Sequence, residues 1–349
     1  MQVYRCPRCG TIAFVETTAC SSCGTPLGLH PPTLAMAETP EQGVELAGAR
    51  WFPCTNRRWG CNWLAAADSG SGRCIACRLI RTRPNNDDTL ALERLIAVSQ
   101  DERRLLIQLA DLGLPVTPWY ERGGGLGFDL LSSRSTGARV TIGHAGGIVS
   151  IDLAESLDAH REALRISLGE PYRTMLGHFR HEVGHYYEWI LVEQTAWIDE
   201  CRTIFGDERA SYAQAIARHY REGAPHDWSD SYISEYATMH PWEDFAECFA
   251  HYLHLTSTLQ TAAAGRLSMH LEGALQMPDH AVTPRASYAD ATMADLLVDW
   301  VPLATFLNRL NRAMGKSDLY PFTIVEPVAR KLDFVHRVVV ASRVQRPLA

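Results

Sequence analysis

Apolar residues recur along much of the chain at intervals of three and four, the spacing that places them on one face of an α-helix. The clearest such run covers residues 172–192, where Pro171 suits a first helical position. Further helices are expected at 88–112, 155–168, 194–205, 207–222, 241–262, 294–314 and 328–341. The chain is therefore predicted to be mainly helical.

Shorter runs with a different period lie between residues 125 and 153. Residues 128–131, 139–142 and 148–153 read as strands separated by Gly and Ser turns, and they predict a small sheet just before the 172–192 helix. Residues 25–50, rich in Pro, Gly and Ala, are expected to form a linker. Helices and a small sheet together predict an α+β fold.

The 172–192 helix carries His181-Glu182-Val183-Gly184-His185, an H-E-x-x-H pattern. Two His residues one helical turn apart project from the same face, so both imidazoles can reach one metal ion. The carboxylate of Glu182 lies beside them, where it can meet a water molecule at the metal. This is the arrangement of zincins, which take two of three zinc ligands and the general base from one turn of helix. His178 is interpreted as a packed or hydrogen-bonding histidine.

The expected 241–262 helix places Glu243 and Glu247 one turn apart on one face. Here the chain resembles gluzincin metallopeptidases with an E-x-x-A-E helix, the lethal-factor-like group among them. That resemblance implies that Glu243 is the third zinc ligand and that Glu247 orients a ligand histidine through its other ring nitrogen. It also implies that Tyr236, seven residues before Glu243, hydrogen-bonds the oxyanion of the tetrahedral intermediate, although ordinary packing is an alternative for this residue. Asp244 is a rival to Glu243, but it points elsewhere around the helix.

Eight of the ten cysteines lie in the first 83 residues. Cys6-Pro7-Arg8-Cys9-Gly10 and Cys20-Ser21-Ser22-Cys23-Gly24 are two C-x-x-C-G knuckles around a predicted strand, which is the pattern of a zinc ribbon with four thiolate ligands. Two disulfides or uncoordinated thiols are the alternative.

A second set of cysteines follows at Cys54, Cys61, Cys74 and Cys77. Its second pair is a C-x-x-C, whereas the first pair is spaced more widely. The set predicts a second four-thiolate zinc site, with an exchange of partners between the two sites left open. Residues 1–83 are therefore predicted to form a double zinc-ribbon module with two structural zinc ions, followed by a zincin-like metallopeptidase domain at 84–349 with one catalytic zinc ion.

The whole chain resembles a bacterial family of zinc-binding metallopeptidases with an N-terminal zinc ribbon. Beyond the ribbon cysteines, the resemblance is carried by Gly60-Cys61-Asn62-Trp63-Leu64, Gly169-Glu170-Pro171-Tyr172-Arg173, His178-Phe179-Arg180-His181-Glu182, His240-Pro241-Trp242-Glu243-Asp244 and Asp318-Leu319-Tyr320-Pro321-Phe322. It implies a peptidase domain and a ribbon, and it does not imply a particular substrate.

Composition and charge narrow the function classes. The chain is 46% hydrophobic and 21% charged, which is ordinary for a globular protein, and its net charge of -7 argues against a general nucleic-acid binder. The first residues lack the apolar segment of a signal peptide, and no run is long enough for a membrane helix. A cytoplasmic location is therefore expected, where cysteines serve as metal ligands before they form disulfides.

Two functions remain as hypotheses. The first is a zinc-dependent peptidase, a hydrolase whose ribbons recruit a partner or a peptide or protein substrate. The alternative is an inert zincin-fold adaptor that binds protein partners through its ribbons. A structural site needs only ligands, so the presence of Glu182 favours catalysis.

Overall fold

The computed structural model describes residues 3–136, 140, 142–153, 174–270, 281–345 and 348 of the 349-residue chain. The chain divides into two compact units. The sheet unit comprises residues 2–158 with the C-terminal residues 343–349, and the helical unit comprises residues 159–342. The helix expected at 155–168 and the residues Pro171 and Tyr172 lie outside the described residues, as does part of the strand expected at 139–142.

The cysteine-rich part of the sheet unit is built from small antiparallel sheets. Their pairings are β1 (Tyr4–Arg5) with β2 (Ile12–Ala13), β3 (Leu27–His30) with β4 (Ala35–Glu38), and the three-stranded order β5 (Val44–Leu46), β6 (Ala49–Pro53) and β7 (Leu64–Ala66). Four of these strands lie wholly or partly in residues 25–50, so the prediction of a linker there was wrong.

Close packing explains why this segment contains a glycine. Leu27 and Leu29 are completely buried, and Gly28 lies between them in β3. A Cβ atom on Gly28 would come within 2.7 Å of the Asn62 carbonyl oxygen and 2.5 Å of the Thr39 side chain. The glycine therefore marks a strand with close neighbours rather than a flexible segment.

The rest of the sheet unit holds helices and a larger sheet. The helices are α1 (Ile75–Leu79), α2 (Thr89–Leu112) and α3 (Ser133–Thr136). The sheet has the order β10 (Gly143–Ala145), β11 (Ile148–Asp152), β9 (Gly127–Leu131) and β8 (Ile80–Thr82). The helix predicted at 88–112 and the strands predicted at 128–131 and 148–153 are confirmed. β8 and β10, at three residues each, carry too little pattern to have been predicted.

Strand β8 ties the cysteine-rich region to this sheet. Ile80 and Thr82 pair in parallel with Phe128 and Asp129 of β9, and the guanidinium of Arg81 bonds the Asp129 carboxylate. The predicted module boundary at 83/84 lies between β8 and α2, whereas the two compact units divide at 158/159. The cysteine-rich region and the sheet therefore share one compact unit.

Glu102 of α2 is a completely buried carboxyl group whose two oxygens have no hydrogen-bond partner among the described residues. Burial raises the pKa of Glu102 well above its usual value, against the opposing charge of Arg103. The folded chain therefore keeps a proton that the unfolded chain releases above about pH 4.3. The free energy of unfolding should fall as the pH rises from there to the raised pKa.

The variant Glu102→Gln tests this pH dependence, because its amide does not ionise. Its stability relative to the wild type should grow with pH by up to about 1.4 kcal/mol per pH unit within that window. Urea unfolding at pH 5.5 and pH 8 measures the difference. Glu93→Gln is the matched control, since Glu93 is exposed on the same helix. An equal response of the two variants to pH would contradict the prediction.

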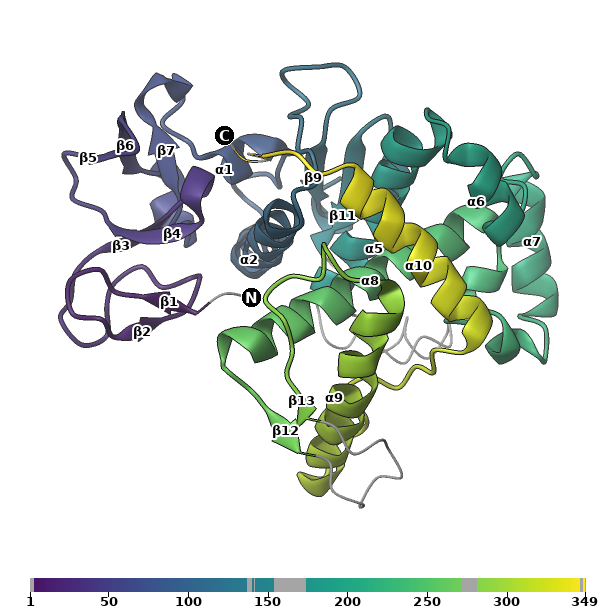
Figure 1. Cartoon of the computed structure of the whole chain (residues 1–349). Helices are drawn as coiled ribbons and strands as arrows, with labels where there is room; N and C mark the ends of the chain where they lie inside the picture. Colours follow the sequence, from purple (N-terminus) through teal and green to yellow (C-terminus); the bar gives the residue numbers. More distant parts are fainter. Residues whose placement is uncertain are drawn as a thin grey trace. The chain divides into compact units, whose positions relative to one another are not determined.

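The helical unit contains six α-helices among its described residues. These are α5 (Met175–Tyr187), which continues as a π-helical segment (Glu188–Glu193), α6 (Ile198–Phe205), α7 (Tyr212–Glu222), α8 (Pro241–Ala264), α9 (Met293–Ala313) and α10 (Glu326–Ala341). Strands β12 (Met269–His270) and β13 (Ala281–Val282) pair antiparallel. Within this unit α8 packs against both α5 and α10 (Figure 1). The architecture of mixed helix and sheet is thus confirmed.

Helices α5 and α8 approach closely because of one glycine. A Cβ atom on the buried Gly184 would lie 2.9 Å from the Cα and 3.1 Å from the carbonyl oxygen of Ala246. The start of α5 is capped by the Thr174 hydroxyl, which accepts from the Gly177 amide, and α8 begins at Pro241 with His240 as its N-cap.

Within the described ranges, no helix combines the length and apolarity needed to cross a membrane.

Candidate metal centres

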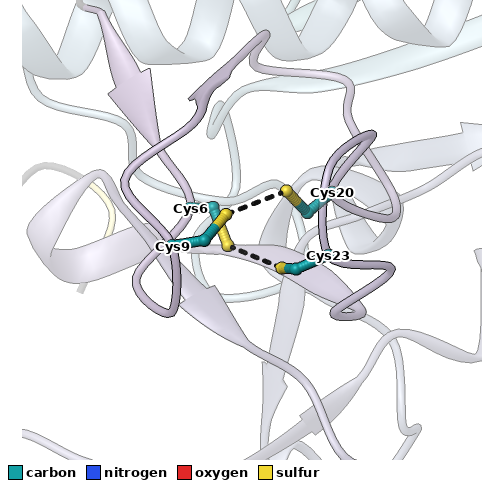
Figure 2. Close-up of side chains that lie close together, drawn as sticks. All are labelled: Cys6, Cys9, Cys20 and Cys23. Carbon is teal, nitrogen blue, oxygen red and sulfur yellow. Dashed lines mark hydrogen bonds between the residues drawn. The ribbon is translucent and has the colours of Figure 1, made fainter.

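The first cysteine cluster brings Cys6, Cys9, Cys20 and Cys23 together from the two knuckles, with the four side chains pointing toward one another (Figure 2). Gly10 and Gly24 have positive φ angles of 74° and 70°, and their amides close the knuckles by bonding the carbonyl oxygens of the first cysteine in each. The sulfurs of Cys6 and Cys23 are 3.7 Å apart and those of Cys9 and Cys20 are 3.5 Å apart.

The second cluster holds Cys54, Cys61, Cys74 and Cys77, all of them buried. Cys74 is the N-cap of α1, where its sulfur accepts from the amide of Cys77. The amide of Cys74 in turn donates to the sulfur of Cys54 at 3.3 Å. Sulfurs that accept from backbone amides suit thiolates, because such bonds stabilise negative charge on sulfur.

Both clusters fit a tetrahedral zinc ion. Four Zn–S bonds of about 2.3 Å place the sulfurs about 3.8 Å from one another. The sulfur–sulfur separations in the structure are 3.5 to 3.7 Å, including 3.6 Å between Cys61 and Cys74. In each cluster the four sulfurs all lie within 4.8 Å of one another. The division into Cys6–Cys23 and Cys54–Cys77 sets matches the grouping expected from the sequence, without exchange of partners.

Two polar side chains connect the cysteine regions. Asn62, which is 1% exposed, donates from its side-chain amide to the carbonyl oxygens of Val15 and Thr17 at 2.6 and 3.1 Å. Arg57 donates to the carbonyl oxygens of Thr18 and Leu27. Both donors lie between Cys54 and Trp63, and their acceptors lie around the second knuckle. The two clusters are therefore parts of one hydrogen-bonded structure.

The third cluster lies in the helical unit, between α5 and α8. The Nε2 atom of His181 is 3.2 Å from Nε2 of His185 and 3.0 Å from Oε2 of Glu243, and His185 Nε2 is 3.5 Å from the same oxygen. Bonds of about 2.0 to 2.1 Å to a tetrahedral zinc ion place its ligand atoms about 3.3 Å apart. The three donor atoms and their spacing therefore fit zinc. Glu243 lies in the first turn of α8, which begins at Pro241.

Glu247 lies on the other side of the His181 ring. Its Oε1 is 2.7 Å from His181 Nδ1, and its Oε2 accepts from the hydroxyl of Ser234 at 2.7 Å. In a neutral imidazole ring, an Nδ1–H group that donates to a carboxylate leaves Nε2 unprotonated, which is the form that binds a metal. With Nδ1 of the His181 ring against Glu247, Nε2 of the same ring faces Glu243 and His185.

The electrostatics of this cluster favour a cation. Burial alone would raise the pKa of Glu243, but the adjacent His185 and His181 imidazoles outweigh burial and hold it well below its usual range. Burial would lower the pKa of His181, and the carboxylates of Glu243 and Glu247 instead raise it well above its usual value. Two ionised carboxylates therefore converge on a pair of imidazoles in a buried place.

Glu182 and Tyr236, the two predicted catalytic residues, lie at the same cluster. Glu182 is 6% exposed, and its Oε1 is 3.5 Å from Nε2 of His178. The ring of Tyr236 lies 5.8 Å from the ring of His181. His178 therefore lies beside the expected base, one helical turn before it.

Asp244, the rival for third ligand, turns away from the histidines. Its Oδ2 lies 2.6 Å from Nζ of Lys331 on α10, and both side chains are buried. Burial raises the pKa of Asp244 to about 7 despite the Lys331 charge. Asp244 therefore takes part in a buried ion pair between α8 and α10.

Two functional contacts were not predicted from the sequence. The phenol of Tyr212 on α7 donates to Oε1 of Glu243 at 2.7 Å, and Ser234 donates to Glu247. Tyr212 lies 31 residues before Glu243 in the chain. No local pattern indicates such a contact. Ser234 stands two residues before Tyr236, so the loop that supplies the tyrosine could have drawn attention to it.

Comparisons with known proteins agree with these clusters. Residues 91–338 match the family described as "Putative zinc-binding metallo-peptidase", and residues 3–88 match a zinc-ribbon domain. An uncharacterized protein of Mycobacterium bovis and one of Mycobacterium tuberculosis are each 40% identical over 343 residues, which is 97% of this chain and 95% of theirs. No solved structure matches the chain. The chain therefore belongs to this family of zinc-binding metallo-peptidases and carries an N-terminal zinc-ribbon domain.

Proposed function

We propose that this protein hydrolyses peptide bonds with one zinc ion held by His181, His185 and Glu243, as a gluzincin-type metallopeptidase. The observation that supports the proposal is the convergence of these three donor atoms, with the buried Glu182 directly after His181 in the same helix. Three protein ligands are the number that catalytic zinc sites use, because one position must stay open for water or substrate. The membership of the chain in a metallopeptidase family supports the same reaction.

The side chains divide the chemistry among them. When bound, zinc would act as a Lewis acid that polarises a carbonyl group and lowers the pKa of a water molecule to near neutral pH. Glu182 accepts the proton of the attacking water and delivers it to the leaving amine. Tyr236 donates a hydrogen bond to the oxyanion of the tetrahedral intermediate. Glu247 keeps the His181 ring in place through Nδ1 while these charges move.

The proposal gives the protein three zinc ions per chain, two of them structural. The two cysteine clusters hold together short strands and turns, so their zinc ions should contribute to the folding free energy of that region alongside its buried apolar side chains. Elemental analysis of the purified protein should find about three zinc ions per chain. A value near one, together with reactive thiols at Cys6 and Cys74, would contradict the structural sites.

The zinc ribbons are proposed to recruit a protein partner or the substrate, in the cytoplasm as the sequence predicts. The alternative, an inert adaptor, keeps the zinc sites but has no use for a base at Glu182. The two functions differ in one observable, which is whether new peptide termini arise in the presence of the protein.

Cleavage of a peptide library derived from a host proteome tests the proposal. The wild-type protein should generate new termini that disappear after removal of zinc by a chelator and return when zinc is restored. The same library treated with Glu182→Gln gives the background, since this variant keeps the metal ligands. Equal sets of termini from the two proteins would refute hydrolysis at this site and favour the adaptor.

A further inference from the structure

Tyr212 joins helix α7 to the third metal cluster. It is the first residue of α7, and its hydroxyl donates to Oε1 of Glu243 at 2.7 Å. Among the residues of α7 only Ala215 is buried, so the helix has little apolar contact of its own. The hydrogen bond of Tyr212 is therefore a specific connection rather than a by-product of extensive packing.

The two oxygens of Glu243 have different neighbours. Oε2 faces the histidines, at 3.0 Å from His181 Nε2 and 3.5 Å from His185 Nε2, whereas Oε1 accepts from Tyr212. Glu243 is only 2% exposed, so little water can replace the phenol. A carboxylate with one oxygen held by a donor cannot rotate to exchange its oxygens without breaking that bond.

The ring of Tyr212 is held by residues next to Glu243. It lies 5.3 Å from the ring of His240 and 5.9 Å from the ring of Trp242. His240 caps α8 through Nδ1, which accepts from the Trp242 amide, and its Nε2 lies 3.0 Å from the carbonyl oxygen of Ala210. The phenol, the helix cap and Glu243 thus form one connected group at the start of α8.

We propose that Tyr212 is a positioning residue that fixes which oxygen of Glu243 faces the two histidines. Its phenol holds Oε1, and Oε2 stays directed toward the histidines as the single oxygen available to zinc. The inference rests on the zinc site of the proposed function. It adds that the third ligand, Glu243, needs the hydrogen bond from Tyr212. The hydroxyl of Tyr212, rather than its ring, carries this role.

The variant Tyr212→Phe separates the hydroxyl from the ring, because phenylalanine retains the packing against His240 and Trp242. Its affinity for zinc at the third site should be about 10- to 100-fold lower than that of the wild type, the usual loss when a partner of a metal ligand is removed. The probe is zinc alone, titrated in competition with a chelator after the cysteine clusters have been filled. Tyr220→Phe is the matched control, since Tyr220 lies on the same helix and is 68% exposed.

Adding Tyr212→Phe to the variant Glu243→Gln shows whether Tyr212 acts through Glu243. In Glu243→Gln, the further change Tyr212→Phe should cause no additional loss of zinc affinity, because the anionic acceptor is already gone. A zinc affinity of Tyr212→Phe within about twofold of the wild type would overturn the proposal, and so would a full additional loss in the Glu243→Gln background.

The affinity measurement also separates this proposal from the proposed hydrolysis. A wild-type protein that binds the third zinc ion and cleaves no peptide would refute hydrolysis, while a weakened affinity in Tyr212→Phe would still support the positioning role. A wild-type protein with no affinity for zinc at the third site would contradict both. Thermal unfolding of Tyr212→Phe close to that of Tyr220→Phe would show that the loss of affinity does not come from misfolding.

Discussion

Glu182→Gln is expected to lower the rate of peptide cleavage by about 10²- to 10⁴-fold, the usual cost of losing a positioned general base. Gln has the shape of Glu but cannot accept a proton at neutral pH. Glu182 is not one of the three residues whose donor atoms converge, so zinc content should stay unchanged. The measurements are kcat/KM on a peptide found in the library experiment and the zinc content of the same sample. Cleavage at the wild-type rate would show that the site performs different chemistry.

Three neighbouring carboxylates provide the comparison for this result. Glu243→Gln replaces an anionic ligand with a weaker neutral one, so zinc affinity and activity should fall together. Glu247→Gln should reduce zinc affinity about 10- to 100-fold, because it weakens the orientation of His181. Asp244→Asn should keep zinc, since Asp244 pairs with Lys331. If Asp244→Asn loses the metal and Glu243→Gln keeps it, the third ligand has been assigned one residue too early.

Gly184→Ala is expected to weaken zinc binding at His181, His185 and Glu243 by about 5- to 150-fold. The added methyl group would lie 2.9 Å from the Cα of Ala246, and backbone atoms cannot rotate away as a flexible side chain can. Such overpacking costs about 1 to 3 kcal/mol, which the protein can relieve by moving α8 away from α5. That movement would carry Glu243 away from the two histidines.

Gly177→Ala on the same helix is the matched control. It brings the same gain in helix propensity of about 1 kcal/mol. Its nearest neighbours are side-chain atoms, the Thr174 hydroxyl at 3.0 Å and the His254 ring at 3.6 Å, rather than backbone. Chelator competition and thermal unfolding of the two variants measure the contrast. Equal zinc affinities for Gly184→Ala and Gly177→Ala would contradict the idea that close contact between the helices sets the metal geometry.

The two halves of the third metal cluster each lie in a short local pattern, whereas the expectation that Glu243 joins the two histidines comes from the resemblance to gluzincins. Helical spacing alone places His181 beside His185 and Glu243 on the same face as Glu247, and the structure has both arrangements. The same spacing turns Asp244 to a different face, where Lys331 meets it. A pattern within one helix is therefore a reliable guide to which side chains share a face.

Contacts between distant segments could not be predicted in this way. Tyr212 meets Glu243 only because α7 and α8 come together in three dimensions, and its surroundings in the sequence resemble those of any amphipathic helix. The strands of residues 25–50 were missed for a related reason. Gly28 reads as flexible in isolation, and only the carbonyl of Asn62, 34 positions away, shows why a side chain is excluded there.

The hydrogen bonds from Asn62 and Arg57 to the second knuckle have a thermodynamic consequence for metal loading. When zinc orders the Cys54–Cys77 cluster, it also fixes Asn62, whose amide holds the backbone of Val15 and Thr17 close to Cys20. The first cluster then loses less conformational entropy when it binds its own zinc ion. Linkage requires the effect to be reciprocal, so each zinc ion should raise the affinity of the other site. The two cysteine clusters are therefore expected to fill cooperatively, with few chains holding a single structural ion.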